Sequence, residues 1–200
     1  MDKSDLQTPL VDDLPRSMRR AWAIVALACL TGGCEALGPE WSSKPIGADQ
    51  SPIHFDHADF DARLAEYALQ QDLKSGNAVY VAHFAGAGAT GVVAAFKAGP
   101  SYVVEERATE TYVAPLLAEA HPVWGASGRS AAHGSPISYR MFRMPGQTTN
   151  CVGFAQLIGQ PADDANHKKA IVFGYFCKSD PRPISASAAE DLISAISLTR

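Results

Sequence analysis

The sequence has no cluster of charge of one sign and no internal repeat of fixed period. Its 17 Lys and Arg residues and 21 Asp and Glu residues are spread along the chain, and after residue 33 like charges meet only in short pairs such as Glu105-Glu106 and Lys168-Lys169. Nucleic-acid binding requires a basic patch or stripe, so we expect no nucleic-acid partner. The balance of apolar and charged residues is that of a globular protein.

The sequence also lacks an apolar run long enough to cross a bilayer. The run Ala21 to Leu30 is about ten residues long, whereas a membrane-spanning helix needs about 20. Arg19 and Arg20 precede the run, and the small residues Gly32 and Gly33 follow it. A basic flank, an apolar stretch and small residues are the three parts of a secretory signal, so we expect residues 1–33 to be a signal peptide.

The stretch before this leader is long and acidic for a signal peptide. Met18 is preceded by Asp2, Asp5, Asp12 and Asp13. A leader that began at Met18 would have the basic start and the length typical of secretory signals. We therefore expect translation to begin at Met18.

Leu30-Thr-Gly-Gly-Cys34 resembles the lipobox of bacterial lipoproteins, in which small residues precede a cysteine that is lipidated and becomes the mature N-terminus. Leu30 lies one position further from the cysteine than in the family pattern. The resemblance implies lipidation of Cys34 and a membrane anchor facing the periplasm. Simple cleavage, which would release a periplasmic protein, is the alternative. Residues 34–55 are rich in proline and lack periodicity, so we expect a tether.

Residues 56–200 have the pattern of a single α+β domain with a mainly antiparallel sheet and a helix at each end. Apolar residues from Phe60 to Leu73 recur at steps of three to four, which predicts a helix over 59–74. Ser185 begins a second predicted helix, over 186–197. Residues 91–97 are predicted as strand or short helix, 111–120 as helix and 122–136 as loop. Strands are predicted at 78–84, 101–105, 137–144, 151–158 and 170–177.

The last two predicted strands carry one cysteine each, Cys151 and Cys177. If these strands pair antiparallel in a hairpin centred on Asp164, the two cysteines face each other. Directly opposed residues are close enough for a disulfide, which is expected in an oxidising compartment. Metal ligation lacks further ligands at a defined spacing, so we predict a disulfide.

The sequence YRMFRMPGQTTNCVGFAQLIG and the later AIVFGYFCKSDPRPISASAAEDLISAI resemble the ending of small uncharacterised exported proteins and lipoproteins of proteobacteria. The resemblance covers residues 137–198. It implies a strand pair with one cysteine in each strand, a proline-containing loop and a final helix. No known activity comes with it.

Gly86, Gly88 and Gly91 form a G-x-G-x-x-G pattern after a predicted strand, and Glu105 ends the next convincing strand. In dinucleotide-binding folds such glycines approach a pyrophosphate, and an acidic residue holds the ribose. Only two helical turns fit before Gly99-Pro100, and the later strands lack the alternating helices of that fold. A glycine-rich turn between strands is therefore the preferred interpretation.

Three residues close together in the sequence, His54, Asp56 and His57, have side chains that can bind a divalent metal. No distant third ligand is identifiable, and carboxylates are also common at the start of a helix, where this segment is predicted to lie. The helix start is the simpler interpretation.

These observations favour a non-enzymatic cell-envelope protein of structural, assembly or ligand-binding type. We expect it in the periplasm or anchored to the membrane through Cys34, with no cofactor and with an envelope protein or small ligand as partner. The alternative is an exported enzyme, either an oxidoreductase that binds a nucleotide at Gly86, Gly88, Gly91 and Glu105 or a hydrolase.

Overall fold

The computed structural model describes residues 41–117, 120–130, 136–146, 148–161 and 167–199. The predicted signal peptide, the start at Met18 and the lipidation site Cys34 lie outside these residues. Within the described part of the chain, no helix has both the length and the apolar character that crossing a membrane requires.

Strands dominate the described residues, and the two α-helices are short. The helices are α1 (Thr109–Val113) and α2 (Ala186–Ser194), with 3-10 turns η4 (Ala48–Gln50), η5 (Ala62–Leu64) and η6 (Ala114–Leu117). The strands are β1 (Trp41–Ile46), β2 (Ile53–Phe55), β3 (Glu66–Asp72), β4 (Ala78–Gly86), β5 (Ala89–Lys97), β6 (Val104–Glu105), β7 (Val123–Ser130), β8 (Ile137–Arg143), β9 (Asn150–Pro161), β10 (His167–Lys178) and β11 (Ile196–Leu198).

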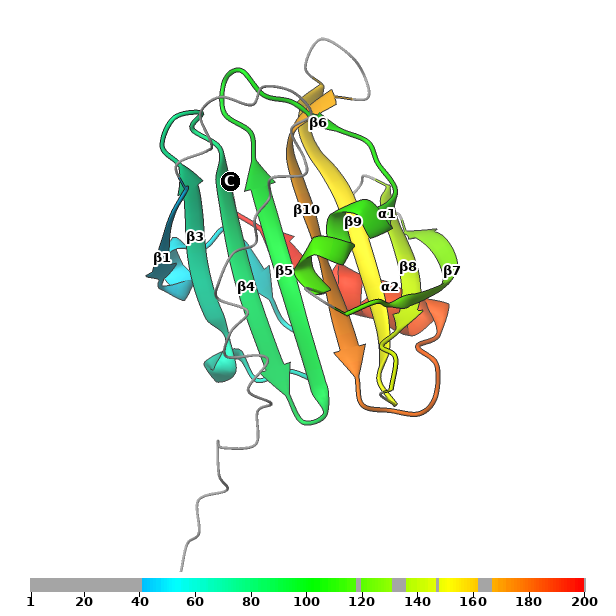
Figure 1. The fold of residues 1–200 in the computed structure, drawn as a ribbon. Helices are drawn as coiled ribbons and strands as arrows, with labels where there is room; N and C mark the ends of the chain where they lie inside the picture. Colours follow the sequence, from blue (N-terminus) through cyan, green and yellow to red (C-terminus); the bar gives the residue numbers. More distant parts are fainter. Residues whose placement is uncertain (1–40, 118–119, 131–135, 147, 162–166, 200) are drawn as a thin grey trace, which may run out of the picture. The chain divides into compact units, whose positions relative to one another are not determined.

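One antiparallel sheet of nine strands organises the fold, in the order β1-β3-β4-β5-β10-β9-β8-β7, with β6 paired to β10 beside this path (Figure 1). Seven of these strands form two meanders, β3-β4-β5 and β7-β8-β9-β10, which are joined where β5 pairs with β10, and β1 and β6 are added to them at β3 and β10. A separate pair, β2 with β11, forms a small second sheet.

The predicted α+β class with a helix at each end is therefore wrong, because the chain is β-rich. Over the predicted helix 59–74, the structure has η5 and then β3, which pairs with β1 on one side and β4 on the other. Pairing on both sides gives hydrogen-bond partners to the backbone N–H and C=O groups of β3. The side chains of β3 favour a helix, so the sequence pattern does not indicate this pairing. The predicted tether is also wrong over 41–55, since this segment forms β1, η4 and β2.

The main core lies between one face of the sheet and the layer made by α2, β2 and β11. Side chains alternate between faces along a strand, so Val172 and Phe176 of β10 point into this core while Cys177 points to the other face. Ser185 caps α2 by accepting the Ala188 N–H at 3.2 Å. The core residues on α2 are Ala189, Leu192 and Ile193.

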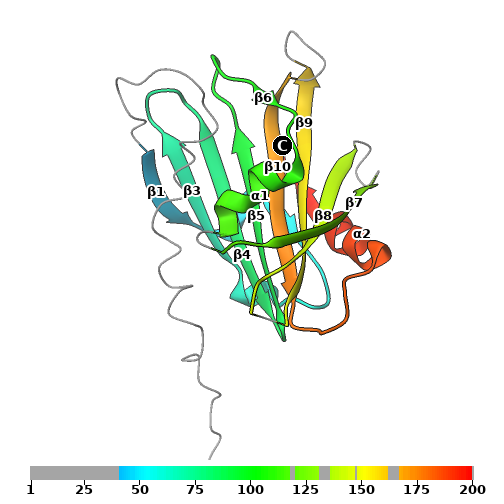
Figure 2. The same cartoon turned by 45° about the vertical axis from the view of Figure 1, so that its right-hand side comes forward.

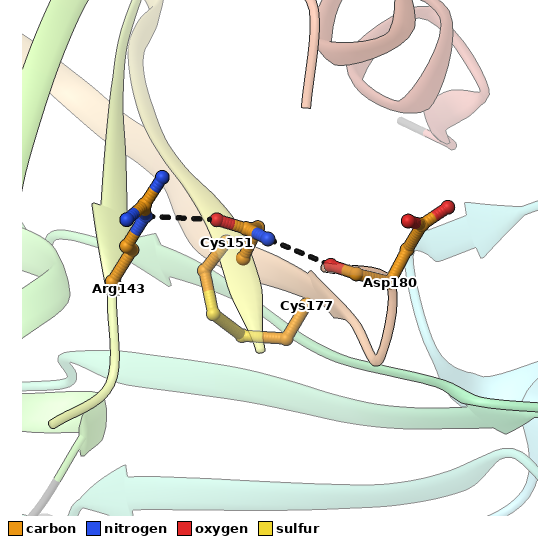
Figure 3. Close-up of a disulfide and its surroundings, with 5 residues drawn as sticks. Arg143, Cys151, Cys177 and Asp180 are labelled. Carbon is orange, nitrogen blue, oxygen red and sulfur yellow. Dashed lines mark hydrogen bonds between the residues drawn. A yellow bond between two sulfur atoms is a disulfide. The ribbon is translucent and has the colours of Figure 1, made fainter. Parts of the chain in front are cut away.

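The opposite face of β8, β9 and β10 is covered by α1 and η6 (Figures 1 and 2). Val113 and Leu117 pack there on Phe142 and on the disulfide between Cys151 and Cys177. The two cysteines are directly opposed in the β9–β10 register, with Cα atoms 4.1 Å apart, which confirms the predicted hairpin and its disulfide (Figure 3).

Asn150 fixes the chain beside this disulfide. Its side-chain oxygen accepts the Arg143 Nε–H at 3.1 Å, and its Nδ2 donates to the Asp180 carbonyl oxygen at 2.7 Å (Figure 3). Nδ2 also donates to the Arg182 carbonyl oxygen at 3.1 Å. Asn150 is buried, so these bonds satisfy its amide away from water. The loop that leads from β10 to α2 is thereby attached to the start of β9.

Two further segments differ from their predictions. Residues 111–120, predicted as helix, contain the last residues of α1 followed by η6, because Pro115 has no N–H to continue an α-helix. Residues 122–136, predicted as a loop from their Gly, Ser and Ala content, contain the edge strand β7. The ambiguous segment 91–97 lies within β5 and is strand.

Candidate functional site

A groove lies between α1 and the strands β7, β8 and β9. One cavity of about 350 Å³ is lined by Thr109, Glu110, Ser127, Gly128, Arg129, Ser138, Tyr139 and Arg140. A second cavity of about 250 Å³ shares Arg129 and Ser138 with the first, so the two are continuous. The other residues of the second cavity are Glu106, Arg107, Tyr112, Pro136, Ala155, Gln156, Leu157 and Ile171. We call this combined feature the α1 groove.

The register of β7 on β8 places the polar side chains in the groove. Ser127 is opposite Arg140, and Arg129 is opposite Ser138. The intervening Tyr139 points to the main core instead, as the alternation along a strand requires. An irregularity between Trp124 and Ser127 shifts the register, so Ser127 and Arg129 share the face that carries α1.

Two of the three arginines at the groove are neutralised by neighbouring carboxylates. Arg140 forms an ion pair with Glu110 of α1 and donates from Nε to the Gly125 carbonyl oxygen at 3.1 Å. Arg107 pairs with Glu105, with 3.2 Å between Nη2 and Oε2. The Arg140–Glu110 pair connects α1 to β8, whereas the Arg107–Glu105 pair is local to the segment before α1.

Arg129 differs from the other two arginines. Among the described residues it has no ion-pair partner, although it borders both cavities. A guanidinium stays protonated and presents several N–H donors in one plane, which matches the two oxygens of a carboxylate. Its charge is therefore available to an anion that enters the groove.

The tyrosine of the groove is occupied by a structural contact. The Tyr112 hydroxyl donates to the Glu105 carbonyl oxygen, and its ring lies 5.7 Å from that of Phe173, measured between centroids. Burial raises the pKa of Tyr112, so the hydroxyl remains a donor at neutral pH. Tyr112 therefore positions α1 on the sheet and is not free to act as a base.

The lining residues offer hydroxyl groups beside one cation. Ser127, Ser138 and Thr109 bring hydroxyl groups, which donate or accept hydrogen bonds. Activation of a serine nucleophile requires an adjacent base. No histidine is among the lining residues, the Glu110 carboxylate is engaged by Arg140, and the second carboxylate of the groove is that of Glu106. The groove thus offers one available cation and several neutral hydroxyls.

The predicted glycine motif lies in the β4–β5 hairpin. Gly86 pairs with Ala89 around a two-residue turn, where Gly88 has a φ of 74°, and Gly91 lies within β5. A dinucleotide site needs a helix after the third glycine, and here a strand follows. Glu105 lies beside His167 at the other end of β10 from this turn, so the structure does not bring it together with the glycines.

The predicted metal ligands point to different partners. His54 Nε2 lies 3.4 Å from the Thr199 hydroxyl, whereas His57 Nε2 lies 3.2 Å from an Asp191 carboxylate oxygen on α2. In the described part of the chain, no group of three or more His, Cys, Asp or Glu residues is arranged to hold a metal. His54 and His57 instead connect the segment around β2 to the end of the chain and to α2.

No family model, curated protein or solved structure matches this chain. The groove residues were not identified from the sequence because they are single polar residues on separate elements. One signal was present: Ser138 and Arg140 alternate with Ile137 and Tyr139 in a convincing strand, which indicates a polar stripe on one face.

Proposed function

We propose that this chain is an exported cell-envelope protein that binds a carboxylate-bearing ligand in the α1 groove without catalysing a reaction. The observation that supports this function is the Arg129 guanidinium, which borders both cavities and has no ion-pair partner among the described residues. Charge-assisted hydrogen bonds from arginine to a carboxylate are short, directional and stronger than neutral ones.

The charges and hydroxyl groups that line the groove indicate how many negative charges a ligand can carry. Arg129 supplies the charge, and Ser127 and Ser138 lie on the same face as neighbours along and across the strands. Glu110 and Glu106 lie nearby and disfavour ligands with a high negative charge. A single carboxylate next to neutral polar groups fits this distribution best.

The proposed compartment is the periplasm, with a lipid anchor at Cys34 or with the leader simply cleaved. The leader pattern in the sequence and the Cys151–Cys177 disulfide both support export, because disulfides persist in oxidising compartments. Replacement of Cys34 by serine should abolish fatty-acid labelling and membrane association. Unchanged labelling would exclude the anchor and leave the binding function untouched.

Binding is tested by following backbone amide signals of the protein by NMR during titration with N-acetylaspartate amide, which carries a single carboxylate, at constant ionic strength. We expect shifts at Ser127 to Arg129 and at Ser138 to Arg140, and N-acetylasparagine amide should cause none. Arg129→Gln should remove the shifts. Arg63→Gln is the matched control, because Arg63 is an exposed arginine paired with Asp61 away from the groove. Equal shifts in the Arg129→Gln protein would exclude the proposed site.

A further inference from the structure

We infer that the outer edge of β7 is a strand-addition site for an extended segment of a partner protein that carries an acidic residue opposite Arg129. This inference rests on the proposed function, because it uses the same cation. It goes further in naming the ligand as a peptide strand and the backbone of β7 as the main contact.

Among the described residues, the outer edge of β7 pairs with no other strand. In the described part of the chain, β7 pairs with β8 alone and ends the main sheet. In an antiparallel ladder, alternate residues direct their N–H and C=O groups toward the one neighbour and the rest away from it. The Cα spacing of Cys151 and Cys177 is that of a non-hydrogen-bonded pair, and alternation from there across β9 and β8 directs the backbone groups of Ser127 and Arg129 away from β8.

The two edges of the main sheet differ in how they are protected. The edge strand β1 has exposed Lys44 and Pro45, and lysine and proline discourage the addition of another strand. β7 has neither residue type, and its one irregularity, between Trp124 and Ser127, lies before the regular segment that starts at Ser127. Its segment Gly125 to Gly128 has only small side chains, with Gly125, Ala126 and Ser127 exposed, so a second backbone can approach closely.

Side chains of β7 specify which strand would fit. Trp124, Ser127 and Arg129 share the face that carries α1, because Trp124 opposes Phe142 and packs on its ring at 4.8 Å between centroids. Residues opposed across neighbouring strands have Cβ atoms about 5 Å apart, so an aspartate opposite Arg129 reaches the guanidinium. The same strand would place a small residue opposite Ser127 and an apolar residue near Trp124.

Charge disfavours a second copy of this chain as the occupant. Two-fold pairing of β7 edges keeps like faces together, so Arg129 would oppose either Ser127 or Arg129 of the second copy. The two Arg129 guanidinium groups would then lie directly opposite or diagonally across the two β7 strands. Their repulsion would destabilise a dimer of this kind. An acidic strand removes this repulsion and satisfies the cation.

The test uses a fluorescein-labelled peptide, Thr-Asp-Thr-Ser-Thr-Leu-Thr, blocked at both ends, and measures its binding to the full chain by anisotropy. Two N-methylated versions carry methyl groups on alternate backbone nitrogens, one set at odd positions and the other at even positions. One version should bind at least tenfold more weakly and the other about as well as the parent, because alternate N–H groups face β7. Changing aspartate to asparagine, or Arg129 to Gln, should weaken binding about threefold.

The outcomes separate this inference from the proposed function. If N-acetylaspartate amide shifts the groove signals but both N-methylated peptides bind as the parent does, strand addition is wrong and the anion site remains. If neither probe depends on Arg129, both are wrong. A dimer of the chain in sedimentation velocity that dissociates when β7 receives Ser127→Pro, and that excludes the peptide, would also overturn the inference.

Discussion

Cys151 and Cys177 join β9 to β10 at directly opposed positions beneath α1, with Cα atoms 4.1 Å apart. The side chains of Val113 and Leu117 rest on this bridge. The disulfide therefore connects the two strands that support α1, and α1 forms one wall of the groove.

Reduction should destabilise the protein substantially. The cysteines are separated by 26 residues, and on the chain-entropy model the closure of such a loop stabilises the fold by about 3.5 kcal/mol. Urea unfolding of the oxidised and reduced wild-type proteins should differ by this amount. The Cys151→Ala/Cys177→Ala protein should match the reduced wild type to within about 1 kcal/mol. Native mass spectrometry that finds two free thiols would contradict the bridge.

The contact between His57 and Asp191 should stabilise α2 on the segment after β2. The Asp59 backbone N–H donates to His57 Nδ1 at 3.2 Å, so the neutral ring has its proton on Nε2 and donates it to Asp191. Asp191→Ala should lower the free energy of unfolding by about 1 kcal/mol. Glu190→Ala, at the exposed neighbouring position, is the control and should have little effect.

The tautomer of His57 is a separate prediction from the same geometry. Two-dimensional NMR of the imidazole nitrogens above the histidine titration range should show the proton on Nε2. A proton on Nδ1 would contradict the hydrogen bond from the Asp59 backbone. Asp191→Ala should leave the tautomer unchanged, because the Asp59 N–H still selects it.

Asp59 should contribute to stability at neutral pH and not in acid. The hydrogen bond from Lys178 lowers the pKa of Asp59 from its ordinary value of 3.8. Because the folded state holds the charged form, this stabilisation is complete above the ordinary pKa and is lost as pH falls through the lowered value. Lys178→Met should raise the pKa of Asp59, measured by NMR of the carboxyl carbon. Lys97→Met is the control, since Lys97 is an exposed lysine on the neighbouring strand.

Gly91 should be required for packing of the sheet. A Cβ at this position would lie 2.4 Å from Cδ1 of Phe176, whose ring is fully buried. Overpacking of this kind costs about 1–3 kcal/mol, so Gly91→Ala should lower the midpoint of thermal unfolding. The loss should shrink when Phe176 is also changed to leucine. Gly125→Ala, where the nearest atom is 3.5 Å away, should be close to neutral.

The β9–β10 hairpin was predictable because its signals are local and consistent. Both strands are rich in β-branched and aromatic residues, and the two cysteines fix one register. The helix α2 was predictable for a similar reason: Ser185 caps it, and an apolar stripe faces the core. It ends at Ser194, earlier than predicted, because Ile196 to Leu198 pair with β2 as β11.

The strand β3 was missed because its residues favour another structure. Most residues of β3 are good helix formers, namely Glu66, Ala68, Leu69 and the two glutamines that follow. The apolar spacing around them also matches a helix. Pairing with β1 and β4 overrides that preference, and the β1 partner lies in a segment without strand signals. Similarly, β7 has few β-branched residues, since an exposed edge strand buries little.

The groove escaped prediction for a different physical reason. Arg129, Arg140 and Glu110 are ordinary charged residues when considered alone, and each lies on a different element. Arg140 and Glu110 pair with each other, and Arg129 has no ion-pair partner within the described residues. This difference is what makes Arg129 a candidate binding residue. Pairing across elements is a property of the tertiary fold, which no local pattern encodes.

The junction of β5 and β10 determines how the chain must assemble. These strands are neighbours in space but belong to meanders at opposite ends of the domain sequence. Each meander can form from hairpins that close short loops, whereas the junction closes a loop that includes β6, α1 and three strands, at a higher entropic cost. We expect the C-terminal meander to acquire its covalent bridge before the junction forms, so formation of the disulfide would precede completion of the sheet.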